Sequence, residues 1–300
     1  MFNTPILFIV FNRPEETQRV FEAIRVRKPK HLFIAADGPR INNHEDIQLC
    51  EETRKIVSNI DWQCDIKTLY RNNNIGCGLG VSTAISWFFS QVDEGIILED
   101  DCLPNESFFK FCSEMLKIYR EDRNIMMVCG TSYQQNSLNH DTYYFSKYIH
   151  IWGWATWKRA WNNYSYHIEQ SNVIEKTFKS KREQLFWKNQ FSLLQNGLDT
   201  WDYQWMHCIW KNNGLSIIPW KNLIANIGFG LNATHTFDIY SDQSNMVSFE
   251  LKKITLSKKV KINSQAERFE RESVLIGSDY EYYYRKFTFK LKKLIKLILK

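Results

Sequence analysis

The sequence lacks a long apolar run, and this absence excludes a membrane-spanning helix. Its first apolar stretch, Ile6 to Phe11, is much shorter than the ~18 residues that a span requires. No basic region precedes that stretch, so we expect no signal peptide. The 300 residues suffice for one large domain or two small ones, and the hydrophobic fraction of 44% is ordinary for a globular protein. Wholly disordered, collagen-like and coiled-coil proteins are therefore excluded.

The cysteines lack the spacing of a metal or redox motif. There are seven, an odd number, and no two of them form a CxxC pair. A zinc ribbon or a thioredoxin-type site is therefore not expected. Scattered, unpaired cysteines in a chain of this size are typical of a reducing cytosol.

The net charge of +6 comes from the last sixteen residues. Residues 285–300 hold seven Lys or Arg and no acid, and without them 32 basic residues face 33 acidic ones. Nucleic-acid-binding proteins usually carry positive charge across a folded face, so we expect no nucleic-acid partner. Wound as a helix, the segment places Phe287, Leu291, Leu294 and Ile298 on one face and lysines on the other. This pattern predicts a helix lying on an anionic membrane surface, although a solvated or domain-packed helix has the same pattern.

The first third of the chain alternates between strand and helix patterns. Strands are expected at residues 5–11, 31–37, 65–70 and 94–101, the first two of them buried, with helices at 14–25, 43–59 and 79–90. This alternation predicts an α/β fold with a mostly parallel sheet. Composition then changes, because nine of the eleven tryptophans fall between residues 152 and 220.

Acidic residues follow two of the predicted strands. Glu99, Asp100 and Asp101 directly follow the strand GIIL, at the edge where ligands of open α/β sheets bind. Such carboxylates suit a hard cation that also binds phosphate oxygens, although a solvated acidic turn capping a helix near Asn105 is an alternative. Asp37 ends the second strand and suits a ribose or a base NH, or simply forms a turn.

Later segments carry further candidates with structural alternatives. The glycine-containing loop from Asn72 to Gly80 is neither a phosphate loop nor a GxGxxG motif, and it is readily explained as a turn before a helix. In WGWATWKRAW, tryptophans at 154, 157 and 161 share one helical face, which favours core packing. Trp152 and Trp154 flank Gly153 and suit the border of a sugar-binding cleft.

Two acids and a histidine complete the set of candidates. In DTWDYQW, Asp202 suits a catalytic base among aromatic rings, whereas Asp199 suits a helix N-cap. His235, in NIGFGLNATHT, suits a metal ligand or a phosphate contact. A lone histidine also often has only a structural role.

The ordered set PILFIVFNRP, AADGPR, NIGCGLG, LEDDCLP, WGWATW, DTWDYQW and NIGFGLNATHT resembles bacterial glycosyltransferases of the GT-A fold over about residues 5–240. It is similar to inverting, metal-dependent enzymes of the N-acetylglucosaminyltransferase I type. The resemblance implies a Rossmann-like nucleotide-diphospho-sugar transferase fold, with a mixed, mostly parallel sheet flanked by helices. It also implies a nucleotide-sugar half at about 1–103, an aromatic-rich acceptor half at 104–240, an extension at 241–284 and a basic helix at 285–300.

The resemblance also implies a role for each matching position. Asp101, and less securely His235, would bind Mn²⁺ or Mg²⁺, and Asp202 would be the catalytic base. The remaining positions would contact the donor: Asn12, Arg13, Asp37, Gly76, Glu99, Asp100, Trp152, Gly153 and Trp154.

We therefore expect a hexosyl- or N-acetylhexosaminyltransferase that moves a sugar, by resemblance from a UDP-sugar, to a glycan or lipid-linked glycan with inversion. We expect it in the cytoplasm, on the inner face of the cell membrane, where surface polysaccharide precursors are made. One alternative is a sugar-nucleotide nucleotidyltransferase, but the first strand is followed by FNRPEE rather than by a basic, glycine-rich loop. The other alternative is a non-catalytic, membrane-docked carbohydrate-binding protein.

Overall fold

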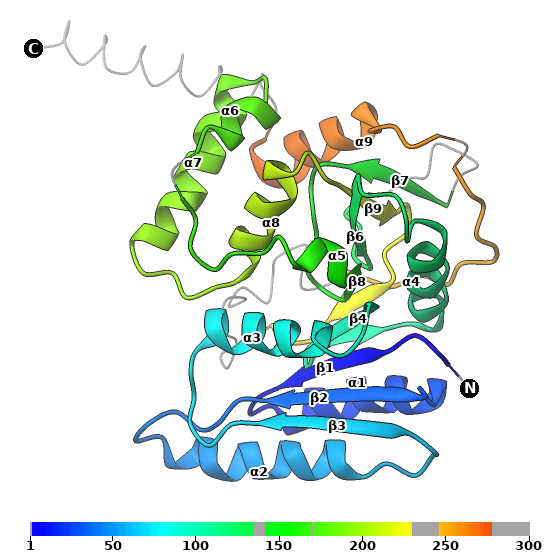
Figure 1. Cartoon of the computed structure of the whole chain (residues 1–300), viewed down its shortest axis with the longest axis vertical. Helices are drawn as coiled ribbons and strands as arrows, with labels where there is room; N and C mark the ends of the chain where they lie inside the picture. The colour runs from blue at the N-terminus through cyan, green and yellow to red at the C-terminus, as the bar shows by residue number, and fades with distance from the viewer. Residues whose placement is uncertain (1, 135–141, 170, 230–245, 258, 278–300) are drawn as a thin grey trace, which may run out of the picture.

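The computed structural model describes residues 2–134, 142–169, 171–229, 246–257 and 259–277. Within these residues, one sheet has the strand order β3-β2-β1-β4-β8-β6-β9-β7. Its strands are β1 (Ile6–Val10), β2 (His31–Ala36), β3 (Asp65–Tyr70), β4 (Glu94–Glu99), β6 (Ile125–Cys129), β7 (Tyr143–Ser146), β8 (Trp154–Trp157) and β9 (Leu215–Pro219). Only β7 and β8 run against the others. The predicted fold class, a mixed and mostly parallel sheet flanked by helices, is confirmed (Figure 1).

Helices cover both faces of the sheet because its central strands are apolar on both sides. In β1, Ile6 and Phe8 belong to one buried cluster and Leu7 to the other, as the alternation of side chains along a strand requires. The first face carries α1 (Pro14–Arg27), α2 (His44–Ser58) and α4 (Glu106–Ile118). The second carries α3 (Cys77–Phe89), α5 (Lys158–Trp161), α6 (Val173–Thr177), α7 (Lys181–Gln195) and α8 (Asp202–Lys211).

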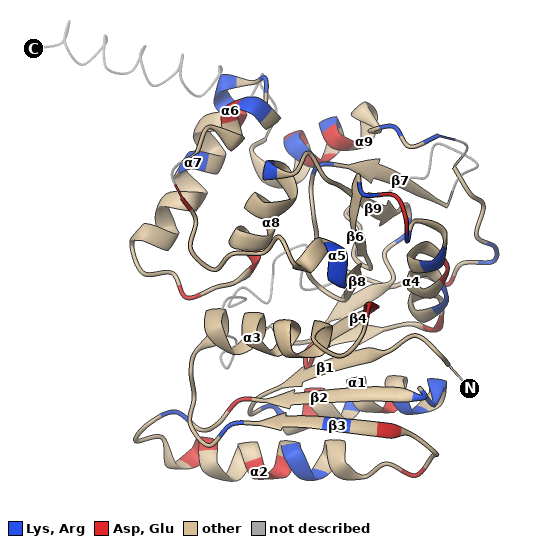
Figure 2. Cartoon of the chain, viewed as in Figure 1, with Lys and Arg blue, Asp and Glu red and all other residues tan. Residues whose placement is uncertain are grey.

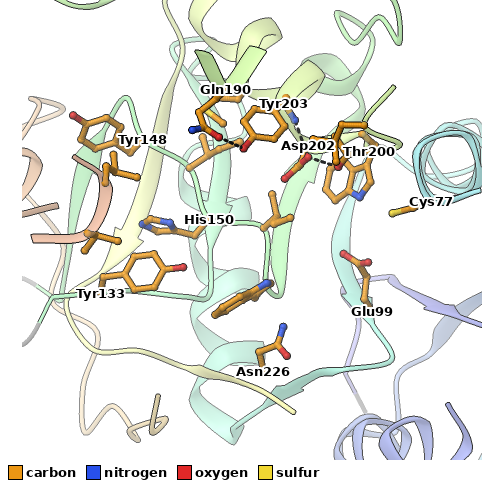
Figure 3. A pocket seen from close by; sticks show the side chains of 18 of the residues that line it. Cys77, Glu99, Tyr133, Tyr148, His150, Gln190, Thr200, Asp202, Tyr203 and Asn226 are labelled. Atoms are coloured by element: carbon orange, nitrogen blue, oxygen red, sulfur yellow. Dashed lines mark hydrogen bonds between the residues drawn. The ribbon is translucent and has the colours of Figure 1, made fainter. Parts of the chain in front are cut away.

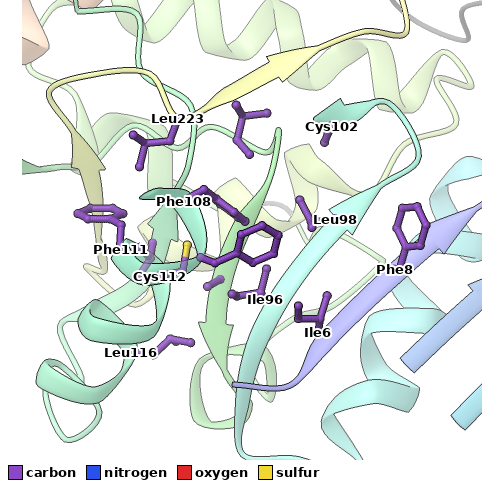
Figure 4. Packing of buried hydrophobic residues seen from close by; sticks show 14 of the residues in the cluster. Ile6, Phe8, Ile96, Leu98, Cys102, Phe108, Phe111, Cys112, Leu116 and Leu223 are labelled. Atoms are coloured by element: carbon purple, nitrogen blue, oxygen red, sulfur yellow. The ribbon is translucent and has the colours of Figure 1, made fainter. Parts of the chain in front are cut away.

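Helix α4 illustrates how sequence and packing agree. The Asn105 side chain accepts a hydrogen bond from the backbone N–H of Phe108 at 3.0 Å and so caps the helix. Phe108 and Leu116 then pack in the same cluster as Ile96 and Leu98 of β4 (Figure 4). Burying each such side chain stabilises the fold by roughly 1.5–3 kcal/mol. A helix beginning near Asn105 is thus confirmed, and Asn105 itself is its cap.

The tryptophan-rich segment differs from its prediction. The spacing of Trp154, Trp157 and Trp161 indicated one face of a helix, but β8 covers the first two positions and α5 the third. Residues three apart in a strand point to opposite faces, and Trp154 and Trp157 indeed join different clusters. The reason is tertiary, because β8 hydrogen-bonds to β4 on one side and β6 on the other.

The described part of the C-terminal extension packs against the rest of the domain. Glu250 accepts hydrogen bonds from the backbone of Glu106 and Ser107 at the start of α4. Asn263 N–H donates to the Phe145 carbonyl at 2.9 Å, and α9 (Ser264–Phe269) continues into the helical turn η1 (Glu270–Leu275). The extension thereby reaches the second face of the sheet.

Charge is distributed unevenly over the helices. Lys, Arg, Asp and Glu mark α1, α2 and α4, whereas α3 carries none (Figure 2). Among the described residues, no helix is long and apolar enough to cross a membrane. The predicted membrane-binding segment 285–300 lies outside the described residues.

Candidate functional site

Several candidate residues meet at one edge of the sheet because neighbouring strands end there. Arg13 follows β1 closely, and Glu99 is the last residue of β4, which is parallel to β1. Strand β8 runs the other way, with Ile97 opposite Trp154. Trp152, just before β8, therefore comes to the same edge.

A cavity of about 520 Å³ opens at this edge, within the size range of small-molecule sites. Arg13, Glu99, Asp100, Asp101, Trp152 and Asp202 line it, together with residues that the sequence had not indicated. In Figure 3, Glu99 lies at one end, Tyr133 and His150 lie at the other, and Asp202 lies between them. We call these the acidic end and the inner end of the cavity.

One guanidinium serves the carboxylates of the acidic end. Arg13 Nη1 lies 2.8 Å from Asp101 Oδ2 and 3.4 Å from Asp100 Oδ1. Asp100 Oδ2 also accepts a hydrogen bond from the Phe11 N–H at 3.0 Å. One positive charge thus faces three adjacent acidic residues.

The pKa values show that this balance is incomplete. Burial, with Asp101 and Asp100 nearby, raises the pKa of Glu99 well above its usual value. Burial likewise raises the pKa of Asp100 to about 7, although Arg13 opposes the shift. Burial acts to lower the pKa of Arg13, but the two aspartates outweigh it and raise that pKa. The negative charges are therefore costly here, and an added cation would stabilise them.

The donor set limits which cation fits. Within the described residues, no three His, Cys, Asp or Glu side chains converge as a complete metal site. Carboxylate oxygens do line the cavity, and Mg²⁺ is commonly held by one or two carboxylates plus substrate phosphates. The residues thus fit a hard divalent ion that arrives with a phosphorylated ligand.

A second, short sheet brings a later segment to Asp101. Strand β10 (Ile224–Asn226) pairs with β5 (Cys102–Pro104), placing Asn226 opposite Cys102. Ile227 N–H donates to the Asp101 carbonyl at 2.8 Å, and a Cβ on Gly228 would stand 2.4 Å from Asp101 Oδ2. Only a glycine lets the backbone approach so closely. His235, the predicted further ligand in this segment, lies outside the described residues.

The two aspartates of DTWDYQW have separate positions. Asp199 accepts hydrogen bonds from the backbone N–H groups of Cys77 and Gly78, at 2.7 and 2.9 Å, and so caps α3 rather than its own helix. Asp202 begins α8 and lines the cavity, accepting hydrogen bonds from the Thr200 hydroxyl and the Tyr203 N–H. The structure therefore places Asp202, and not Asp199, in the cavity that Glu99, Asp100 and Asp101 line.

Three predicted donor contacts lie outside the lining of the cavity. Asp37 accepts hydrogen bonds from Gly38 N–H and Ile75 N–H, both at 3.0 Å, and burial raises its pKa. Asn12 donates to Asp46 Oδ1 at 2.8 Å. Gly76, with φ +86°, is the N-cap of α3. None of the three lines the cavity.

The segment around Gly153 divides between the cavity and the core. Trp152 lines the cavity, whereas Trp154 is fully buried and stacks on Trp201 with ring centroids 5.5 Å apart. Gly153, at φ +58°, leaves no room for a Cβ, which would stand 2.5 Å from Ile224. The expectation that Trp154 borders a pocket is therefore wrong, because β8 carries it into the core.

Apart from Trp152, the inner end consists of residues that the sequence does not indicate. Tyr148 and His150 share the segment between β7 and β8, whereas Tyr133 follows β6, Gln190 lies in α7 and Glu270 lies in η1. Of these residues, only His150 could have been predicted from the sequence, because it stands two positions before Trp152. Glu270 could not have been predicted, because it reaches the cavity only through the packing of the C-terminal extension.

The chain resembles known proteins only weakly. No family model and no curated protein matches the sequence. Similar solved structures include HddC from Yersinia pseudotuberculosis, with 10% identity, a TM-score of 0.33, and coverage of 57% of this chain and 83% of that one. A 4-diphosphocytidyl-2C-methyl-D-erythritolsynthase from Anaerococcus prevotii has 9% identity, a TM-score of 0.35, and coverage of 64% and 100%. A UDP-glucose pyrophosphorylase complexed with UDP-glucose has 9% identity, a TM-score of 0.38, and coverage of 74% and 92%.

These similarities are too low to assign an activity. The pyrophosphorylase is of the nucleotidyltransferase class given above as an alternative, and none of the three is named as a glycosyltransferase. The class that the structure itself defines is a mixed α/β domain with a ligand-sized cavity at the strand ends.

Proposed function

We propose that the protein is a nucleotide-sugar-dependent glycosyltransferase of the GT-A type. The observation that carries the proposal is that one cavity holds both the carboxylates that end β4 and, beyond them, Asp202 with an aromatic-lined inner end. A sugar-transfer site needs a place for a diphosphate, a base and a place for an acceptor. The three parts of this cavity match those needs in that order.

The acidic end would hold the donor. Asp101, with Asp100 or Glu99 beside it, would hold Mn²⁺ or Mg²⁺ together with the diphosphate oxygens. When bound, the ion would supply charge neutralisation of the leaving group. Arg13, paired with Asp101 at 2.8 Å, would contribute a second positive charge at the same place. A UDP-sugar remains the proposed donor through the family resemblance.

Asp202 would take the proton of the acceptor hydroxyl. Its carboxylate begins α8, and the Thr200 and Tyr203 hydrogen bonds fix its orientation. Retention would need a second, nucleophilic carboxylate close to the reacting carbon. Both carboxylate oxygens of Asp199 accept hydrogen bonds from the start of α3. Asp199 is therefore poorly placed to act as that nucleophile, which supports a single inverting displacement.

Sugar-nucleotide synthesis is the second candidate, and the position of Arg13 favours it. A basic residue just after the first strand, lining the cavity, is suited to a nucleoside triphosphate. Against this function, the turn after β1 contains no glycine, and Arg13 is its single basic residue. The two functions differ in their chemistry, since only synthesis releases pyrophosphate from a triphosphate and a sugar phosphate.

One experiment separates the candidates. The full chain is incubated with a panel of nucleotide sugars and Mn²⁺ or Mg²⁺, and slow donor hydrolysis is followed by release of the nucleoside diphosphate. In parallel, sugar phosphates and nucleoside triphosphates are tested for pyrophosphate release. We expect metal-dependent hydrolysis of one nucleotide sugar and no pyrophosphate. Pyrophosphate release would overturn the glycosyltransferase, and failure to bind any nucleotide would favour the carbohydrate-binding alternative.

The acceptor and membrane assignments remain part of the proposal. A glycan or lipid-linked glycan would approach from the cytoplasmic leaflet, with residues 285–300 on the anionic surface. Each Lys or Arg near such a surface contributes about 1 kcal/mol. Flotation with anionic vesicles tests this: truncation after Tyr284 should abolish co-flotation while donor hydrolysis survives. If the truncated protein floats as well as the full chain, residues 285–300 are not the membrane anchor.

A further inference from the structure

The inner end of the cavity contains a buried acid that its surroundings leave incompletely paired. Glu270 is 1% exposed and His150 is 7% exposed, and both line the cavity. His150 Nε2 lies 3.2 Å from Glu270 Oε1 but without the alignment of a hydrogen bond. Within the described part of the chain, both Nε2 and Glu270 Oε2 lack a hydrogen-bond partner. Buried polar groups of this kind are normally satisfied, so a ligand is the natural partner.

Aromatic rings surround this pair and give the inner end its shape. Tyr133 meets the His150 ring edge-on, with centroids 4.7 Å apart and planes at 89°. In Figure 3 the hydroxyl of Tyr133 points away from its own segment and into the cavity. Trp152 lies beside Tyr133, with ring centroids 6.5 Å apart. Polar atoms set among flat apolar faces suit a ligand that has both hydroxyl groups and an apolar side.

Charge narrows the class of ligand further. Among the described residues that line the cavity, Arg13 is the sole Lys or Arg, and it is engaged at the acidic end. The inner end therefore offers no strong cation to a carboxylate or a phosphate. Glu270 would repel such a group, whereas a neutral hydroxyl can donate to Oε2.

Glu270 is held in place from outside the cavity. Three residues earlier, Glu267 accepts hydrogen bonds from the Ser146 hydroxyl at 3.0 Å and from Lys147 Nζ at 2.7 Å. These contacts fix α9 against β7, and η1 follows directly. The extension thus presents Glu270 on a fixed support, as recognition of a small ligand requires.

We infer that the inner end is an acceptor subsite for an uncharged glycosyl unit, whose hydroxyls bind Glu270 and His150 and whose apolar face lies against Tyr133 or Trp152. This inference rests on the proposed function, which places the donor at the acidic end. It makes Glu270 a specificity-determining residue. Acceptor sugars bearing a carboxylate or a phosphate are excluded at this subsite.

Saturation-transfer NMR on the full chain, with UDP and Mg²⁺ present, tests the inference. The probes are the methyl glycosides of glucose, galactose and N-acetylglucosamine, with methyl glucuronide as the acidic member. We expect a neutral glycoside to bind and the glucuronide not to bind. Glu270→Gln should weaken the neutral glycoside about tenfold or more, as loss of a charged hydrogen-bond partner does, and should reduce discrimination against the glucuronide. A merely structural role would not change that discrimination.

Glu272→Gln is the matched control. Glu272 lies in the same turn and pairs with Arg271, and it does not line the cavity, so binding should be unchanged. If Glu270→Gln fails to fold, Tyr133→Phe is tested instead: it removes the hydroxyl that points into the cavity, which would also hydrogen-bond the glycosyl unit, and it should still weaken binding. Unchanged binding in the variant that folds, or equal binding of the glucuronide to the wild type, overturns the inference.

Donor hydrolysis on the same samples separates the two hypotheses. Hydrolysis of a nucleotide sugar without binding of any glycoside overturns the acceptor subsite and leaves the transferase standing. Glycoside binding without hydrolysis of any nucleotide sugar overturns the transferase and leaves a site for neutral sugars.

Discussion

The two ends of the cavity are built in contrasting ways. The acidic end takes its three carboxylates from consecutive positions, Glu99 to Asp101, with Arg13 facing them. The inner end takes its residues from points as far apart as Tyr133 and Glu270. A contiguous cluster is visible in a sequence, whereas a dispersed one exists only after folding. Substitutions at the acidic end should therefore impair donor and metal binding, whereas substitutions at the inner end should weaken acceptor binding.

The largest effect is expected at Asp101. Asp101→Asn keeps the shape of the side chain and removes the charge that would hold the cation. Turnover should be abolished, and nucleotide binding should weaken only when metal is present. Metal-dependent donor hydrolysis and nucleotide titration measure both effects. Full activity in this variant, or in excess chelator, would contradict the assignment of the acidic end.

The next largest effect is expected where the two ends meet. Asp202→Asn should lower turnover by about 10²–10⁴, the usual contribution of general base catalysis, while donor and metal still bind. Steady-state transfer rates and donor titration separate these readouts. If Asp199→Asn reduced turnover far more than Asp202→Asn, the roles of the two acids would be exchanged.

The core beneath the cavity should respond through stability rather than binding. Trp154→Ala removes a fully buried ring stacked on Trp201 and should cost about 3–5 kcal/mol in the free energy of unfolding. Trp152→Ala, at the cavity wall, should cost less stability and weaken ligand binding instead. Urea unfolding and nucleotide-sugar titration of both variants test the division. Similar losses of stability would show that Trp152 is also a core residue.

A smaller effect is expected from the cap of α3. Asp199→Ala removes the acceptor of two N–H groups at the start of that helix and should cost about 1 kcal/mol. Chemical denaturation measures the loss, and Glu52→Ala on the exposed face of α2 is a control expected to change little. An unchanged free energy of unfolding in Asp199→Ala would mean that the cap is dispensable.

Local rules predicted the first third of the fold closely and were less successful after it. From Ile6 to Glu99, strands and helices alternate with clear apolar runs, and the predicted elements match β1–β4 and α1–α3 closely. At Trp154, by contrast, a helical spacing lies in a strand, because pairing with β4 and β6 outweighs it. The same difference applies to the site. Glu99 and Asp202 were found from local context, whereas Glu270 depends on an extension folding back.

The contact between Gly76 and Asp199 restricts how this chain can be recombined. A Cβ on Gly76 would stand 2.4 Å from Asp199 Oδ2, and the residue has φ +86°. The loop that precedes Asp202 thus packs, through Asp199, against a glycine more than a hundred residues earlier in the chain. Exchanging the first half of the chain with that of a homologue would displace the aspartate pair unless both positions were transferred together. In directed recombination, crossovers between residues 76 and 199 should therefore be tolerated only when both parents have glycine and aspartate at these two places.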